Sequence, residues 1–388
     1  MRKSFSSVLT ALFATLSVAA FSAAAQDPVA AAPAAASGSA WADPANWHSV
    51  KPIETPNIVY ATVPRIPNPS SQASPNPGTP NGVRAPIADT GPAGTMDLHL
   101  DFYQVASAKP TPVVLQIHGG GWIRGDRPSS SSSFGPFFSA GMSVVAIEYR
   151  NAIDAPAPGA IQDVRCAMAW IKANAKKYNF DPDKVVPWGG SAGGHLALMA
   201  GYAPASMNPP GCTDQPKVAA IIDMYGASDV ASALTYPGSR DFTHQWIGLD
   251  LPLPPDPAPA STIPPTATSP PASPASTESA NPDGMPRPRR QAPRWPDPTE
   301  AVLARAREAS PLTYIHPGLP PTFIINGDQD HTYEPTQSYR LKAALDAAHV
   351  PNQEDIVVGG GHGNFSPAEN EKGYLLGLKF LQANGVIQ

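Results

Sequence analysis

Apolar residues recur along most of the chain with two periods, and together they predict a sheet that alternates with helices. Short apolar runs typical of buried strands occupy residues 112–117, 142–147, 184–188, 218–225, 322–325 and 355–358. Alternation over 57–63 and 96–103 predicts two half-buried strands, the second antiparallel and at a sheet edge. Helical spacing covers 160–177, 335–349 and 370–383, with a further helix after residue 191. The fold class is therefore α/β, a mostly parallel sheet with helices on both faces.

Two segments depart from this pattern. Residues 26–56 are rich in Ala, Pro and Ser and carry two tryptophans, which predicts a tether or an arm wrapped on the domain. Between residues 251 and 298 one residue in three is proline, so this stretch cannot form a packed helix or sheet. It could be a lid or a disordered insertion. The predicted organisation is one α/β domain over 57–388, interrupted by the 251–298 insertion.

The beginning of the chain has the pattern of a secretory signal peptide. Basic Arg2 and Lys3 precede an apolar run over residues 8–21 and a small-residue cleavage pattern that ends at Ala25. A membrane anchor is the weaker interpretation, because the apolar core is short and lacks a stop-transfer flank. We therefore expect residues 1–25 to be removed and the protein to be periplasmic or secreted.

Composition narrows the possible partners. The 388 residues include 49 prolines and carry a formal net charge of −5, and this acidity argues against nucleic-acid binding. No later stretch has the roughly 20 apolar residues needed to span a membrane. Cys166 and Cys212 would meet an oxidising compartment after export, which permits a disulfide but leaves two separate thiols equally open. The sequence leaves the oligomeric state open.

The first candidate for chemistry is the G-x-S-x-G stretch over residues 189–193. It lies between a predicted strand and a helix, which favours a nucleophile elbow, a strand-to-helix turn too tight for side chains beside its serine. Ser191 is the expected nucleophile, and Gly189 and Gly193 are the neighbours that must lack side chains. The N–H group of Ala192 and the helix dipole would stabilise a developing oxyanion.

A nucleophilic serine needs a base and an acid, and two downstream loops offer them. The strand over 322–325 is followed by Asp328 and Asp330, and the strand over 355–358 is followed by His362 among glycines. Loops at the carboxyl ends of parallel strands share one sheet edge, and Ser, Asp, His is the chain order of α/β-hydrolases. We expect Asp330 to be the acid, because Asp328 directly follows a glycine and is more typical of a turn cap. His362 is the expected base.

The glycine-rich loop 118–122 supplies the remaining part of such a site. The N–H groups of Gly120 and Gly121 are expected to point into the cleft and hold an oxyanion together with that of Ala192. Phosphate binding is disfavoured, because neither G-x-G-x-x-G nor a Walker lysine is present. Trp122 and Tyr225 are further candidates for substrate contact. The other histidines of this region, His118 and His195, are expected to be structural hydrogen-bonding groups.

As an ordered set, these motifs resemble the esterase branch of the α/β-hydrolases, which includes the hormone-sensitive-lipase-like carboxylesterases. They are most similar to secreted bacterial feruloyl and acetyl-xylan esterase-like proteins. The resemblance runs from about residue 96 to the C-terminus, apart from the insertion, and rests on residues 118–122, 148–150, 161–182, 189–196, 224–229, 310–314, 327–330 and 361–363. It implies Ser191 as nucleophile, Asp330 as acid and His362 as base. It also implies a structural ion pair between Arg150 and Asp163.

Three departures from that family pattern surround the cleft. Asn326 stands where a histidine is usual, residues 331–335 replace a more apolar run, and Gly190 replaces a frequent acidic residue. None of them removes a group of the expected triad. All three line or support the cleft, so the substrate preference of the family does not transfer directly.

The predicted function is a serine carboxylic-ester hydrolase that needs no metal or organic cofactor. Its expected substrates are small acyl or aryl esters, such as feruloyl or acetyl groups on polysaccharides. The same triad would also serve a formamidase-like or prolyl-peptidase-like amide hydrolase, or a lipid esterase. A binding module without activity would lack a triad member, and all three are present.

Overall fold

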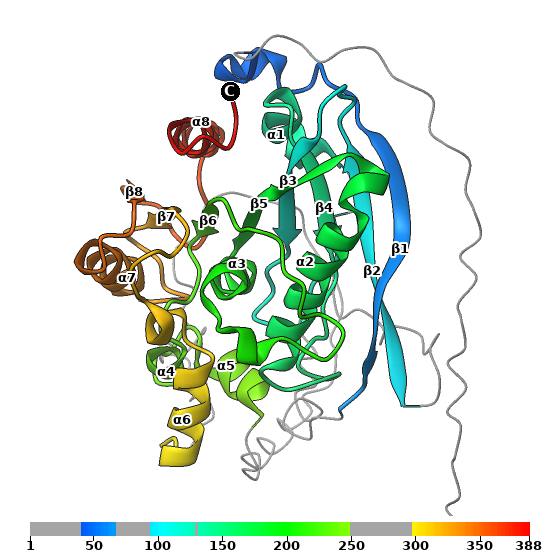
Figure 1. Ribbon diagram of the computed structural model, residues 1–388. Helices are drawn as coiled ribbons and strands as arrows, with labels where there is room; N and C mark the ends of the chain where they lie inside the picture. The colour runs from blue at the N-terminus through cyan, green and yellow to red at the C-terminus, as the bar shows by residue number, and fades with distance from the viewer. Residues whose placement is uncertain (1–39, 67–93, 129–130, 249–296) are drawn as a thin grey trace, which may run out of the picture. The chain divides into compact units, whose positions relative to one another are not determined.

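A computed structural model describes residues 40–66, 94–128, 131–248 and 297–388, all within one compact unit (Figure 1). The expected signal peptide over 1–25, the part of the 26–56 arm that precedes residue 40, and nearly all of the 251–298 insertion lie outside these residues. Those expectations remain predictions. No helix in the described ranges combines the length and apolarity required to cross a bilayer.

One eight-stranded mixed sheet organises the described residues. Its strands are β1 (Ile53–Pro64), β2 (Thr95–Gln104), β3 (Thr111–Ile117), β4 (Ser143–Ile147), β5 (Phe180–Gly190), β6 (Ile221–Met224), β7 (Thr322–Gly327) and β8 (Asn352–Val357). They lie in the order β1-β2-β4-β3-β5-β6-β7-β8, with β1 and β2 antiparallel and the other six parallel. This confirms the predicted fold class. The expected edge position of residues 96–103 is wrong, because β1 covers that strand.

Helices connect the parallel strands and cover both faces of the sheet. They are α1 (Gly135–Ser139), α2 (Gly159–Tyr178), α3 (Ala192–Tyr202), α4 (Val230–Ala233), α5 (Arg240–Ile247), α6 (Glu300–Glu308), α7 (Thr336–Ala347) and α8 (Pro367–Ala383). The pattern predicted α2, α3, α7 and α8. It missed α1, α4, α5 and α6, which are too short for a helical period to stand out in a window of about 11 residues.

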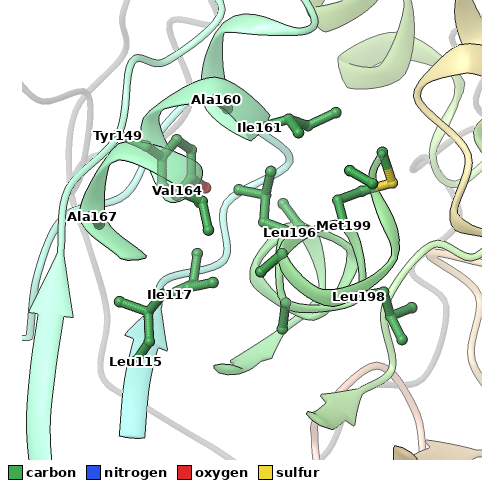
Figure 2. Close-up of a cluster of buried hydrophobic side chains, with 14 of the residues drawn as sticks. Leu115, Ile117, Tyr149, Ala160, Ile161, Val164, Ala167, Leu196, Leu198 and Met199 are labelled. Carbon is green, nitrogen blue, oxygen red and sulfur yellow. The ribbon is translucent and has the colours of Figure 1, made fainter. Parts of the chain in front are cut away.

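The central strands are buried on both sides, which explains their continuous apolar runs. Leu115 and Ile117 of β3 pack with α2 and α3 on one face, while Val114 joins α1 and α8 on the other. Figure 2 shows Ile117, Val164 of α2 and Leu196 of α3 pointing toward one another. This packing anchors the end of β3 and the beginning of α3, between which the candidate site lies.

The described part of the N-terminal arm packs against the domain. Trp41 and Trp47 are 4% and 8% exposed, and the Trp47 indole N–H donates to the Trp41 carbonyl at 2.9 Å. The Trp47 ring also meets the edge of Tyr374 in α8 at 5.8 Å. Between a tether and a wrapped arm, the structure favours the wrapped arm for this stretch. The first strand begins at Ile53, four residues before its expected start.

Two internal links hold α2 in place. Cys166 and Cys212 form a disulfide with Cα atoms 4.8 Å apart, which decides between the two alternatives that the sequence left open. The expected ion pair is confirmed, since Arg150 Nε and Nη2 donate to Asp163 at 2.9 and 2.7 Å. Burial raises the pKa of the Asp163 carboxyl, and the Arg150 guanidinium opposes that shift. The pair stabilises the connection from β4 into α2.

Candidate active site

Ser191 lies on the sharp turn between β5 and α3, as the G-x-S-x-G pattern predicts. Its backbone has φ 58° and ψ −122°, a strained conformation for a residue with a side chain. A methyl group on Gly189 would lie 2.5 Å from the Ile117 carbonyl oxygen, and one on Gly193 would overlap the same oxygen. The turn therefore requires both glycines, and it holds the Ser191 hydroxyl above the end of the sheet.

The loops after β7 and β8 bring an acid and a base to this serine. His362 Nε2 lies 2.8 Å from Ser191 Oγ, and His362 Nδ1 lies 2.7 Å from Asp330 Oδ2. The Asp330 side chain is 1% exposed and the His362 side chain 18% exposed, so the carboxylate is shielded from water and the imidazole is partly accessible. The structure thus joins the three residues named from the sequence in one hydrogen-bonded chain.

Backbone contacts settle the orientation of the Asp330 carboxylate. Its Oδ1 accepts N–H groups from Thr332 at 2.7 Å and Tyr333 at 3.1 Å, which leaves Oδ2 for His362. A carboxylate only accepts hydrogen bonds, so the His362 Nδ1–H donates to it. The lone pair of Nε2 then faces the Ser191 O–H, which is the tautomer that a general base needs.

Asp328, the competing acid, has another place. Its Oδ1 accepts the Gly359 N–H at 2.7 Å and thereby ties the β7 loop to the β8 loop. This agrees with the capping role expected from its position after a glycine. The carboxylate beside His362 is that of Asp330.

The 118–122 loop runs alongside Ser191. Gly120 and Gly121 have φ values of 119° and 62°, and Gly119 is packed so closely that an added methyl group would lie 2.8 Å from the Gly190 carbonyl oxygen. Ala192 is the first residue of α3, so its N–H has no acceptor within the helix. These positions are compatible with an oxyanion hole formed by Gly120, Gly121 and Ala192, and that role stays a prediction.

A cavity of about 550 Å³ opens over these groups. Its lining residues are Gln116, Ile117, His118, Gly119, Gly120, Gly121, Ile123, Arg124, Trp188, Gly189, Gly190, Ser191, Met224, Tyr225, Phe242, Thr332, His362, Asn370 and Tyr374. Its volume is in the range of pockets that hold small organic ligands. Tyr225 contributes its ring, which meets the His362 imidazole edge-on at 4.9 Å.

The expectation that Trp122 contacts substrate is wrong for its side chain. Trp122 is fully buried, stacks on Trp246 at 4.2 Å and donates its indole N–H to His195 Nδ1 at 3.2 Å. His195 Nε2 in turn donates to the Ala309 carbonyl at 2.7 Å, which confirms its structural role. Burial lowers the pKa of His195 to about 4, so its imidazole is neutral at pH 7.

Several lining residues were not named as site residues from the sequence, among them Phe242, Asn370 and Tyr374. Phe242 belongs to the unpredicted α5, and Asn370 and Tyr374 belong to α8, which was predicted only as a helix. Tyr333, directly behind the triad, was also missed as an individual residue. The departure at residues 331–335 was the signal that could have pointed to it.

Among the residues that the structure describes, no group of three or more His, Cys, Asp or Glu side chains could hold a metal ion. The chemistry that the geometry offers is that of the serine, the histidine and the aspartate. This set can activate a hydroxyl for attack on an acyl carbon.

Comparison with known proteins bears on the class of protein. The family model described as BD-FAE matches residues 99–264. The matched residues are less than half of the chain, and together with the relatives that follow they support an α/β-hydrolase esterase.

Three known proteins illustrate the similarity. Esterase LipQ of Mycobacterium tuberculosis is 27% identical over 266 residues, which cover 66% of this chain and 51% of LipQ. A butyrate-bound thermophilic esterase of Thermogutta terrifontis has a TM-score of 0.52 at 24% identity, covering 75% of this chain and 91% of its own. A carbohydrate esterase from gut microbiota, in truncated form, has a TM-score of 0.52 at 19% identity, covering 87% and 98%.

At 24% and 19% identity, the two structural neighbours show only that the fold is shared. The chain spans about half the length of LipQ. The relatives that the chain matches in sequence bear the names esterase and probable carboxylic ester hydrolase.

Proposed function

We propose that the protein is a serine carboxylic-ester hydrolase that works through an acyl-enzyme. The observation that carries this proposal is the chain Asp330–His362–Ser191, with contacts of 2.7 and 2.8 Å, at the floor of a 550 Å³ cavity. An isolated serine hydroxyl is a weak nucleophile, and a base in this position makes it competent.

In the proposed mechanism, Ser191 Oγ attacks the ester carbonyl carbon while its proton moves to His362 Nε2. The carbonyl π electrons move to the oxygen, which the N–H groups of Gly120, Gly121 and Ala192 hold. Removal of one such donor typically slows catalysis by about 100- to 1,000-fold. The alcohol leaves with the proton from His362, and water then releases the acid by the same steps in reverse.

The proposed substrates are small acyl or aryl esters, such as acetyl or feruloyl groups on polysaccharides. Support comes from the cavity size and from its aromatic lining, which includes Trp188, Tyr225, Phe242 and Tyr374. Planar aromatic acyl groups pack well against such side chains. The gut carbohydrate esterase and the butyrate-bound esterase are consistent with this substrate range.

We also propose that the protein is exported to the periplasm or beyond, with cleavage after Ala25. The disulfide between Cys166 and Cys212 supports this location, because such bonds persist mainly in oxidising compartments. Mass spectrometry of the protein isolated from its native cells tests the proposal. A mature chain that begins at Gln26 is expected, and a retained leader in a cytoplasmic fraction would contradict it.

A substrate panel tests the activity. We expect the wild type to hydrolyse 4-nitrophenyl acetate, methyl ferulate or acetylated xylan, and Ser191→Ala to lose this activity. Longer 4-nitrophenyl esters and an anilide probe the lipid-esterase and amide-hydrolase alternatives. A wild type that cleaves no ester, or a Ser191→Ala variant with full activity, would refute the proposal.

A further inference from the structure

Tyr333 is a buried tyrosine whose ring packs against His362 of the triad. It follows Asp330 by three residues and is 2% exposed. Its backbone N–H donates to Asp330 Oδ1 at 3.1 Å, and its ring meets the edge of the His362 ring at 5.5 Å with planes 69° apart. The ring also meets the Phe242 ring edge-on at 5.9 Å. These contacts fix the phenol relative to the acid and the base.

The hydroxyl of Tyr333 differs from those of three other buried tyrosines. The hydroxyls of Tyr60, Tyr149 and Tyr202 bond the Glu148 carbonyl, the His118 carbonyl and Thr322 Oγ1 at 2.6, 3.0 and 2.6 Å. Within the ranges that the structure describes, no atom completes a hydrogen bond with the Tyr333 hydroxyl. A buried O–H without a partner costs about 1–3 kcal/mol, so its retention beside a reacting group calls for a function.

The surroundings of this hydroxyl identify its neighbour and its protonation state. Burial, followed by the Asp330 charge, raises the pKa of the phenol well above its usual value, while the Ser191 hydroxyl acts in the opposite direction. The Ser191 hydroxyl is thus the hydrogen-bonding neighbour of this phenol, although the pair does not meet the combined distance and angle limits of a full hydrogen bond. A phenol with so high a pKa keeps its proton at pH 7, which makes it a donor and not a base.

We propose that Tyr333 is a catalytic residue whose O–H donates to Ser191 Oγ, the reacting atom, when negative charge develops there. The inference rests on the proposed hydrolase function. In acylation, Oγ gives its proton to His362 Nε2 and bonds the acyl carbon, the bond from that carbon to the alcohol oxygen breaks, and the alcohol leaves with the proton from His362. In deacylation, His362 takes a proton from water as the water oxygen bonds the acyl carbon. The carbon–Oγ bond then breaks, its electron pair stays on Oγ, and Oγ regains a proton from His362. Tyr333 keeps its own proton throughout.

Because Oγ is the same atom with every substrate, the contribution of Tyr333 is independent of the ester. Tyr333 is not among the residues that line the cavity, so its loss has no direct effect on substrate contacts. The expected signature is a lower kcat with little change in KM, equal in size for different acyl groups. A residue that merely shaped the cavity would change KM and discriminate among esters.

Tyr333→Phe is the decisive variant, since it removes one oxygen and retains the ring contacts with His362 and Phe242. We expect kcat to fall about threefold to tenfold for 4-nitrophenyl acetate and butyrate alike. Inactivation by phenylmethylsulfonyl fluoride, in which Oγ attacks sulfur and fluoride leaves, should slow by a similar factor. The melting temperature should stay the same or rise, because an unpartnered buried hydroxyl has been removed.

Tyr202→Phe is the matched control, because it deletes a buried hydroxyl that bonds Thr322 Oγ1, away from the triad. It should lower the melting temperature and leave the three rates unchanged. If Tyr333→Phe reacts with esters and with the sulfonyl fluoride at wild-type rates, Tyr333 has no part in catalysis. The inference about Tyr333 then fails, and the proposed hydrolase function stands. A wild type that cleaves no ester refutes the proposed function, and the sulfonyl fluoride rates still test Tyr333. If Ser191 does not react with the fluoride either, both proposals fail.

Discussion

Replacing Asp330 with asparagine should abolish most activity without unfolding the protein. Oδ1 of Asp330 accepts two backbone N–H groups, from Thr332 at 2.7 Å and Tyr333 at 3.1 Å. In the variant, the amide oxygen must keep that place, because the amide NH₂ group cannot accept hydrogen bonds. The NH₂ group is then directed at His362 Nδ1, where the carboxylate Oδ2 had been.

This arrangement forces the wrong tautomer on the base. His362 Nδ1 must become an acceptor for the new NH₂ group, so the ring proton moves to Nε2, which faces Ser191 Oγ at 2.8 Å. Nε2 can then no longer take the serine proton, and the charged imidazolium also loses its counter-charge. For a triad of this kind the expected loss in kcat is about 10⁴-fold, or about 5 kcal/mol of transition-state stabilisation.

The assay is steady-state hydrolysis of 4-nitrophenyl acetate, with circular dichroism to verify folding. Asp328→Asn is the matched control, because its side-chain oxygen can still accept the Gly359 N–H and it does not touch His362. We expect that control to keep activity within a few-fold of wild type. An Asp330→Asn enzyme within tenfold of wild type, or an equal loss in the control, would refute the assignment of the acid.

Three further predictions concern stability. Gly193→Ala should yield misfolded or inactive protein, because its methyl group would overlap a carbonyl oxygen of β3. Gly377 lies inside α8, and an added methyl group there would be 3.7 Å from its nearest neighbours, so Gly377→Ala should raise the unfolding free energy in denaturant by about 0.5–1 kcal/mol. Asp163→Asn leaves the buried Arg150 guanidinium without its counter-charge, so it should cost about 3–5 kcal/mol of unfolding free energy; a loss below 1 kcal/mol would contradict this reading. Burial lowers the pKa of His195 from 6.5 to about 4, so protonation of the unfolded chain should lower the unfolding free energy as the pH drops. Between pH 7 and pH 5 the wild type should lose about 2 kcal/mol more than His195→Gln. Parallel pH profiles of the two proteins would contradict this prediction.

The triad could be named from the sequence because each member follows a recognisable local signal. Ser191 lies in a glycine pattern whose sterics are local, and Asp330 and His362 each follow a short apolar strand. The carboxyl ends of parallel strands meet at one edge whatever the details of packing. Three loops far apart in the chain were therefore expected to converge, and the structure places them in hydrogen-bonding contact.

The wider surroundings of the site depend on contacts that local patterns do not encode. Trp122 stands next to the oxyanion loop, but its indole turns into the core because His195 accepts its N–H and Trp246 stacks on it. Cys166 and Cys212 could be paired only when α2 and the loop after α3 had been placed side by side. In each case the partner lies many residues away, so its side-chain direction follows from packing and not from periodicity.

The sequence by itself thus determined the sheet, the order of the catalytic loops and the reaction class, because strand and turn preferences act over a few neighbouring residues. The tertiary structure alone decided which side chains line the cavity, which way the Trp122 indole turns, and that Tyr333 packs against His362. Those features arise where α5, α8 and the β7 loop pack together around Ser191, and such packing is a property of the assembled core.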